Sequence, residues 1–233
     1  MYIGLCFICI VVDIAFRYHT FVRKGMDEIE EKSENYKQVT PFSTKHATVF
    51  FGDSITEFCP LEDIYASYMK LQGVFVINRG IRSEQTGEML RRLDDTVLKL
   101  EPRNLVMLMG INDMLAGVKQ EDIVNNIREI IRQTKKKCPQ TNILLQSIYP
   151  INKHMRTSLF QRMEAFDVDN EAIKRVNKQL FQLAKDEGIK YIDVYDVLID
   201  QEGDLKRAYS YDGLHPNTKG YLALRDHIIE NLR

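Results

Sequence analysis

Short apolar runs alternate along this chain with longer segments in which apolar residues recur every three or four positions. The short runs predict five strands, and the periodic segments predict amphipathic helices between them. Such alternation is typical of right-handed βαβ units, which build a parallel sheet with helices on both faces. The expected strands are Thr48–Phe51, Val74–Ile77, Leu105–Met109, Ile143–Ile148 and Tyr191–Val194.

Ordinary start and stop residues bound the expected helices. Pro60 precedes a short helix, and Ser83 is a candidate cap for the helix that follows the second strand. Pro102, Pro139 and Gly188 follow the ends of three others. The expected helices are Leu61–Leu71, Glu84–Leu100, Gln120–Lys137, Asp169–Asp186 and Thr218–Leu232.

The first 40 residues differ from the remainder of the chain. Residues 1–16 are apolar apart from Asp13, but this run is shorter than the ~20 residues that span a bilayer. It also lacks the basic start and the small-residue cleavage site of a secretory signal. We expect either a membrane anchor or an apolar helix packed on the domain or on a partner, so the chain is either membrane-associated or cytoplasmic.

Residues 26–38 alternate acidic and basic side chains with few apolar ones. This pattern predicts a solvated helix or a linker. The chain is therefore expected to have two parts, an N-terminal segment with a charged linker (residues 1–40) and a folded domain (residues 41–233).

The composition is typical of one α/β enzyme domain and limits the classes of partner that the domain is expected to bind. The chain has 233 residues, of which 44% are hydrophobic, and a net charge of -1, so no basic field favours nucleic acid. Its four cysteines (Cys6, Cys9, Cys59 and Cys138) are not arranged as two pairs of metal ligands. No cluster of histidine and carboxylate residues has the spacing of a metal site either. We expect neither metal nor cofactor. The oligomeric state stays open, with a homodimer as one option.

Polar residues follow three of the expected strands, each beside a glycine. The strands lead into Gly52-Asp53-Ser54-Ile55, Asn78-Arg79-Gly80 and Gly110-Ile111-Asn112-Asp113. In an open parallel sheet the carboxyl ends of the strands form the ligand crevice, so these residues are expected near one another. Close to the C-terminus, Asp212-Gly213-Leu214-His215 adds a carboxylate and an imidazole three residues apart.

A serine hydroxyl becomes a useful nucleophile when a base lies within hydrogen-bond reach and a third group orients that base. Ser54, His215 and Asp212 supply these parts, in one of several chain orders that occur in such triads. Each segment alone is also consistent with plain turn chemistry. Asp53 and Asp113 are expected to cap helices or turns rather than to take part in catalysis.

These four segments resemble the blocks that carry the Ser, Gly, Asn and His of the SGNH (GDSL-type) hydrolase family. The resemblance spans residues 47–232 and is greatest to the branch of bacterial acylhydrolases and platelet-activating-factor acetylhydrolase subunits; Ile55 stands where the family name implies Leu. It implies an α/β three-layer sandwich with a flavodoxin-like, five-stranded parallel sheet of order 2-1-3-4-5. It also implies three oxyanion donors, which are the backbone N–H groups of Ser54 and Gly80 and the side-chain amide of Asn112.

The expected function is that of a serine esterase, a carboxylic-ester hydrolase acting through an acyl-enzyme. Its substrates would be acyl or acetyl esters of lipids, carbohydrates or small alcohols. The alternative is a catalytically inactive binding or scaffold protein on the same fold. The presence of all five site residues favours the enzyme, since a scaffold has no physical need for them.

The connection after the fourth expected strand is long. No strand or motif falls between residues 150 and 169, and such connections are usually functional or carry structure of their own. Either this stretch covers the edge of the core, or it overhangs Ser54 and shapes an acyl or leaving-group pocket, with Met155 and Phe160 as substrate contacts. Its apolar residues recur at helical spacing: Met155, Leu159, Met163 and Phe166.

Overall fold

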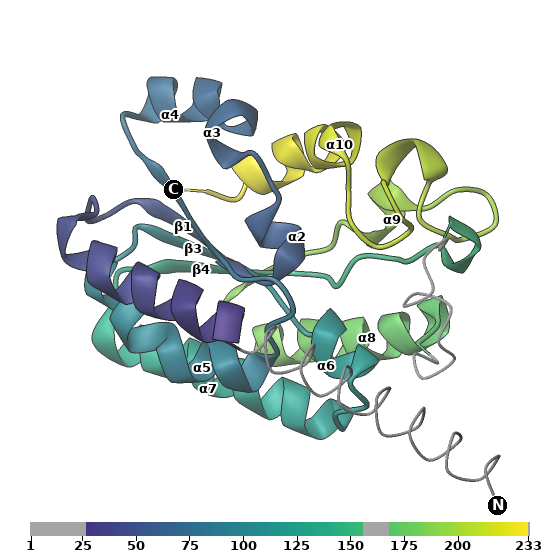
Figure 1. Cartoon of the computed structure of the whole chain (residues 1–233), viewed down its shortest axis with the longest axis horizontal. Helices are drawn as coiled ribbons and strands as arrows, with labels where there is room; N and C mark the ends of the chain where they lie inside the picture. Colours follow the sequence, from purple (N-terminus) through teal and green to yellow (C-terminus); the bar gives the residue numbers. More distant parts are fainter. Residues whose placement is uncertain (1–26, 156–167, 233) are drawn as a thin grey trace, which may run out of the picture.

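A five-stranded parallel sheet of order β2-β1-β3-β4-β5 forms the centre of the molecule in the computed structural model, which describes residues 27–155 and 168–232 (Figure 1). This confirms both the predicted α/β class and the strand order that the family resemblance implied. The strands are β1 (Thr48–Gly52), β2 (Val76–Gly80), β3 (Asn104–Leu108), β4 (Asn142–Gln146) and β5 (Lys190–Ile192).

Three adjacent strands of the sheet are buried along their whole length. Every residue of β1, β3 and β4 is buried, because helices cover both faces of a parallel sheet. Gly52 pairs with Gly80 on one side and with Leu108 on the other. A Cβ on Gly52 would lie 2.2 Å from the Leu108 carbonyl oxygen, so this close approach requires glycine.

Helices cover the two faces of the sheet as separate layers (Figure 1). One layer contains α5 (Thr86–Thr96), α7 (Gln120–Lys137) and α8 (Asn170–Asp186), and the other contains α3 (Leu61–Ile64), α4 (Ala66–Gln72), α9 (Tyr195–Leu198) and α10 (Thr218–Ile229). Two further short helices follow strands directly. They are α2 (Ser54–Glu57) after β1 and α6 (Ile111–Leu115) after β3.

The longest of these helices, α7, illustrates why the sequence forms helix here. Its buried positions recur at helical spacing at Ile123, Ile127 and Ile130, which gives one apolar face toward the core. Acidic residues lie in its first turn and three lysines in its last, so side-chain charge complements the helix dipole at both ends. The predicted first and last residues of this helix and of the five strands agree with the structure within a few positions.

The second strand lies further along the chain than predicted. It begins at Val76 and continues through Asn78 and Arg79 to Gly80, although these residues were expected to form the turn after it. The polar side chains are tolerated because each finds backbone partners. The Asn78 amide donates to Thr56 O at 2.9 Å, and the Arg79 Nε donates to Thr96 O at 3.0 Å.

Two predicted helices also differ in their bounds. The helix expected from Glu84 begins at Thr86, with Gln85 rather than Ser83 as its N-cap and with Glu88 completing a capping box. The helix expected over Leu61–Leu71 is two short helices that meet at Tyr65, whose backbone angles are not helical (φ -104°, ψ 11°).

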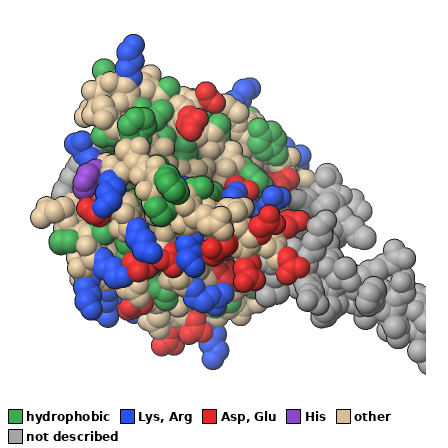
Figure 2. All heavy atoms as spheres, turned by 60° about the vertical axis from the view of Figure 1, so that its left-hand side comes forward, with side chains coloured by type: hydrophobic (Ala, Val, Ile, Leu, Met, Phe, Trp, Pro, Cys, Tyr) green, Lys and Arg blue, Asp and Glu red, His purple; other side chains and the backbone are tan. Residues whose placement is uncertain are grey.

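A further helix spans residues 27–39 and lies beside α5 (purple in Figure 1). It falls where the alternating charges predicted a solvated helix or a linker. Figure 2 shows the face at the left of Figure 1, on which cationic and anionic side chains are interspersed.

Two sets of expectations concern residues outside the described part of the chain. They are the anchor expected in residues 1–16, and the stripe formed by Leu159, Met163 and Phe166 together with the substrate contact Phe160. Within residues 27–155 and 168–232, no helix is both long and apolar enough to cross a bilayer.

Candidate active site

Ser54, His215 and Asp212 form a continuous hydrogen-bonded chain. Ser54 Oγ lies 2.9 Å from His215 Nε2, and His215 Nδ1 lies 2.7 Å from Asp212 Oδ2. With its proton on Nδ1, the imidazole donates to the carboxylate and accepts from the serine hydroxyl through Nε2. The fold thus brings Ser54 to the Asp212–His215 pair, although Ser54 and His215 are 161 positions apart in the sequence. Their geometry is that of a nucleophile, a base and an orienting group.

The Asp212 carboxylate also fixes the loop that carries His215. Its Oδ1 accepts the backbone N–H groups of Leu214 at 2.9 Å and His215 at 2.8 Å. Partial burial favours the protonated acid, but the hydrogen bonds from the His215 ring and from these two N–H groups outweigh it. The pKa of Asp212 therefore falls to about 2, and the residue stays a carboxylate near neutral pH.

Neighbouring contacts hold this loop against the domain. Gly213 has a positive φ of 88°, and a Cβ there would lie 2.1 Å from Asn152 O. Asn152 N donates to Gly213 O at 2.7 Å, and the Ser210 hydroxyl donates to His215 O at 2.9 Å. His215 is therefore held from both sides of its loop.

Ser54 is the first residue of α2 and follows the turn at the end of β1. Asp53 is the N-cap of this helix, as predicted, because its Oδ1 accepts the Ile55 N–H at 2.9 Å. Tyr221 of α10 donates its hydroxyl to Ile55 O at 2.7 Å, which ties the helix that begins with Ser54 to α10. The ring of Phe58 packs against the imidazole of His215, with 5.2 Å between ring centroids.

Asp53 is the residue before Ser54, and its remaining oxygen, Oδ2, is a buried polar atom without a hydrogen-bond partner among the described residues. Burial raises the pKa of Asp53 to about 7, against the opposing effects of the Ile55 N–H and His215, while Asp113 and Glu84 add to the rise. A fully buried carboxyl without a second partner is therefore stabilised as the neutral acid.

Asn112 lies in α6 beside the segment of residues 81–85, which joins β2 to α5. Its side-chain amide donates to Glu84 O at 3.0 Å, and this contact places Asn112 next to Ser83. The Ser54 N–H, in the first turn of α2, has no acceptor among the described residues, as is usual for the first N–H groups of a helix. Two of the three expected oxyanion donors thus lie in elements that flank this segment.

Gly80 differs from the expectation, because its N–H is already engaged. It donates to Asn78 Oδ1 at 2.8 Å from within β2. Glycine is required at this position for packing, since a Cβ on Gly80 would lie 2.3 Å from Glu57 N and 2.8 Å from Asp53 O. Gly80 therefore lets β2 pass close beneath α2, which is a packing role rather than that of a free donor.

Ser83 is a functional candidate that the sequence alone did not indicate. Within the described residues its N–H meets no acceptor, whereas the other N–H groups of this segment do: Ile81 to Gly52 O, Arg82 to Glu57, Glu84 to Ile81 O and Gln85 to Glu88. Ser83 also has a left-handed backbone with φ 62°, which is uncommon for a residue other than glycine. Its only sequence signal is its place between a strand end and a helix cap.

The other polar residues of the motifs support the framework of the site. Asp113 accepts the Thr86 N–H at 2.9 Å and the Thr86 hydroxyl at 2.5 Å, so it holds the start of α5. Met155 lies beside the loop that carries His215, since a Cβ on Gly213 would come 3.1 Å from the Met155 Cβ. Across residues 27–155 and 168–232, no group of three His, Cys, Asp or Glu side chains is placed to hold a metal ion.

Comparison with known proteins agrees with this arrangement. The GDSL-like lipase/acylhydrolase family matches residues 50–223, which include all three residues of the hydrogen-bonded chain. The chain belongs to this family. Membership confirms the resemblance stated above, together with the predicted class of carboxylic-ester hydrolases.

Two curated relatives of this family member are similar over most of the chain. An isoamyl acetate-hydrolyzing esterase of Saccharomyces cerevisiae is 25% identical, over 78% of this chain and 84% of the relative. An N-acylneuraminate cytidylyltransferase of Escherichia coli O18:K1:H7 is 26% identical over 86% of this chain. The chain spans 47% of the length of that cytidylyltransferase.

Solved structures of GDSL-type proteins share the fold. A Streptococcus pneumonia protein, provisionally described as a platelet activating factor, superposes with a TM-score of 0.83 at 29% identity. The match covers 94% of this chain and 99% of that protein. A GDSL-like lipase from Bacteroides thetaiotaomicron superposes with a TM-score of 0.69 at 22% identity, over 85% of this chain and 97% of that one.

Proposed function

We propose that this GDSL-family protein is a serine esterase that hydrolyses acyl or acetyl esters through an acyl-enzyme on Ser54. The proposal rests above all on the hydrogen-bonded chain from the Ser54 hydroxyl through His215 to Asp212. Ser54 attacks the ester carbonyl while His215 Nε2 takes its proton. His215 then returns that proton to the leaving alcohol, and water repeats the sequence on the acyl-enzyme. Asp212 keeps the imidazole in the required tautomer and stabilises its charged form.

The negative charge that develops on the carbonyl oxygen needs donors that are free in the resting enzyme. We assign this role to the Ser54 N–H, the Ser83 N–H and the second N–H of the Asn112 side-chain amide, whose other N–H donates to Glu84 O. Gly80 is replaced by Ser83 in this set because the Gly80 N–H already donates to Asn78. Asn112→Ala should lower kcat by roughly 10²–10³, as for the loss of one oxyanion donor. Ser83→Gly keeps the N–H and should retain kcat within about twofold, which would show that the hydroxyl itself is dispensable.

The substrate class is inferred from the relatives and from the site. The S. cerevisiae relative is named for hydrolysis of isoamyl acetate, which favours acetyl or other short acyl esters of small alcohols here. Phe58 lies against His215 and is half-exposed, so it offers an apolar surface beside the reacting groups. Met155 is a second apolar group at the loop of the base.

The decisive experiment measures hydrolysis of p-nitrophenyl acetate and butyrate by the full chain and by Ser54→Ala. We expect turnover that is lost in the variant, and covalent labelling of Ser54 by a fluorophosphonate probe. Both results require an activated serine, because an unactivated hydroxyl reacts with neither. A well-folded chain that shows no turnover on any ester and no labelling would instead support the scaffold protein.

A further inference from the structure

Helix 27–39 contacts the strand end that leads into the proposed oxyanion segment. The Lys32 ammonium lies 2.7 Å from Glu57 Oε1, and the Tyr36 hydroxyl donates to Gly80 O at 3.1 Å. The guanidinium of Arg79 lies 4.8 Å from the centroid of the Tyr36 ring. The helix that the sequence predicted as a solvated helix or linker thus makes three contacts with β2 and α2.

Glu57 joins this helix to both parts of the site. It is the last residue of α2, the helix that begins with Ser54. Its Oε2 accepts the Arg82 N–H at 2.5 Å, one residue before Ser83, and its Oε1 pairs with Lys32. The Glu57 side chain is only 11% exposed, so its charge depends on these partners more than a surface carboxylate would.

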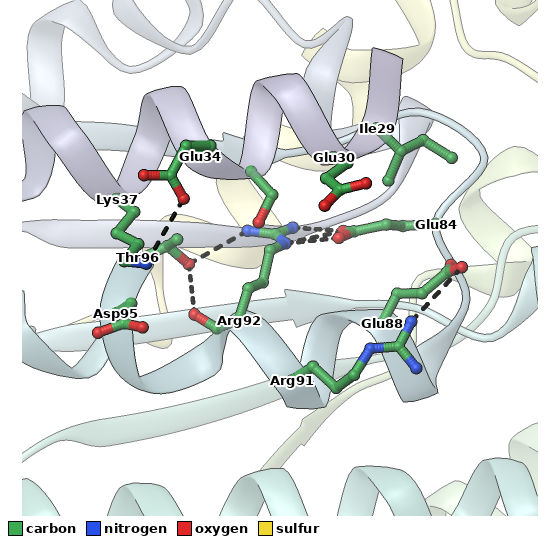
Figure 3. Close-up of a pocket in the computed structure, with 11 residues that line it drawn as sticks. Ile29, Glu30, Glu34, Lys37, Glu84, Glu88, Arg91, Arg92, Asp95 and Thr96 are labelled. Carbon is green, nitrogen blue, oxygen red and sulfur yellow. Dashed lines mark hydrogen bonds and ion pairs between the residues drawn. The ribbon is translucent and has the colours of Figure 1, made fainter. Parts of the chain in front are cut away.

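The same helix adds little to the hydrophobic core. Among the described residues, none of the buried apolar core or of the residues packed on it comes from residues 27–39. A cavity of about 430 Å³ separates much of the helix from α5 (Figure 3), lined from the helix side by residues such as Glu30 and Glu34. On the α5 side Glu84 and Arg92 form a buried ion pair at 2.5 Å. Polar contacts at Lys32 and Tyr36 therefore carry much of the attachment of this helix beside the site.

From these contacts we propose that Lys32 and Tyr36 are positioning residues for catalysis, which act through Glu57 and Gly80 on the segment that presents the Ser83 N–H. Lys32 holds the Glu57 carboxylate where it accepts the Arg82 N–H, and Tyr36 holds the carbonyl at the end of β2. The inference rests on the proposed esterase function. It makes residues 27–39 part of the catalytic unit, although the sequence assigned them to an N-terminal segment and linker.

The test compares Lys32→Met and Tyr36→Phe with Lys37→Met in the full chain. Lys37 is an exposed lysine of the same helix that pairs with Glu34, so it is a matched control. We expect Lys32→Met to lower kcat for p-nitrophenyl acetate roughly tenfold with KM changed less than twofold, because displaced donors weaken transition-state binding selectively. Tyr36→Phe should act in the same direction, Lys32→Arg should recover most of kcat, and Lys37→Met should match the wild type.

Amide hydrogen exchange supplies a readout that does not need activity. Exchange in residues 79–85 should be faster in Lys32→Met than in the wild type or in Lys37→Met, with equal melting temperatures. If the wild type hydrolyses no ester, the esterase proposal fails while this exchange difference still tests the positioning. Unchanged exchange in Lys32→Met, or a kcat within twofold of the wild type in an active enzyme, would overturn the inference.

Discussion

Replacing the buried Asp53 by asparagine should stabilise the protein at pH 8 and change little at pH 4. Asp53 Oδ1 accepts the Ile55 N–H and Oδ2 is buried without a partner. An asparagine oxygen can keep the first contact, and its amide group resembles the neutral acid in shape. The variant therefore removes a titration while it preserves the helix cap.

The magnitude follows from the raised pKa. Burial moves the pKa of Asp53 from 3.8 to about 7, and each unit is worth ~1.4 kcal/mol. Well below pH 3.8 the folded and unfolded chains both hold the proton, and no penalty arises. As the pH rises toward 7, the unfolded chain releases its proton while the folded chain retains it, so the wild type loses stability. At pH 8 this loss reaches at most ~4 kcal/mol, and Asp53→Asn avoids it.

Urea unfolding of both proteins at pH 4, 5.5, 7 and 8 measures this difference. Asp186→Asn is the control, because Asp186 is exposed at the end of α8 and accepts a hydrogen bond from Gln182; its effect should be small at every pH. Comparison with the wild type cancels the titration of all shared groups. A wild type that is more stable than Asp53→Asn at pH 8, or a difference that is constant with pH, would refute the reasoning.

Four further predictions concern the site and its surroundings. Asp212→Asn should lower kcat by up to about 10⁴ with an unchanged melting temperature, because the imidazole loses its orienting acceptor; an unfolded variant would make Asp212 structural instead. Gly80→Ala should destabilise the chain by about 1–3 kcal/mol in urea unfolding, since the new methyl group overlaps α2, whereas a neutral effect would contradict the close packing. Deletion of residues 1–18 should leave a folded and active enzyme, as the site lies beyond residue 47; loss of folding in circular dichroism would show that this segment packs on the domain. Replacing Met155 and Phe160 together by alanine should change the preference between acetyl and longer acyl esters in a chain-length series, and a large loss of stability with an unchanged preference would assign both to the core.

The fold was predictable from the sequence because its strands and helices have different periodicities. Buried strands such as β3 are continuous apolar runs, and helices such as α7 show one apolar face, so each element follows from local pattern. The order of the strands needed the family resemblance, since a local pattern does not determine which strands are neighbours. The end of β2 was misplaced because Asn78 and Arg79 resemble turn residues until their distant backbone partners are known.

The site was predictable to the extent that its chemistry requires particular side chains. Ser54, Asp212 and His215 are recognisable because a nucleophile, a base and an orienting group need those residue types. The oxyanion donors are harder to identify, because a backbone N–H exists at every residue except proline and leaves no trace in the side chain. Gly80 was expected to be an oxyanion donor because glycine lets the backbone approach closely. Only its hydrogen bond to Asn78, which engages the Gly80 N–H, favours the Ser83 N–H instead.

The separation of Ser54 and His215 along the chain has a consequence for synthesis on the ribosome. Ser54 and α2 emerge early, but His215 follows 161 residues later, and Tyr221 must emerge after that to donate its hydrogen bond to Ile55 O. No nascent chain or fragment that ends before residue 215 can contain the complete hydrogen-bonded chain. Under the proposed mechanism, ester hydrolysis would therefore require translation through His215, and premature termination would release a chain with Ser54 but without His215.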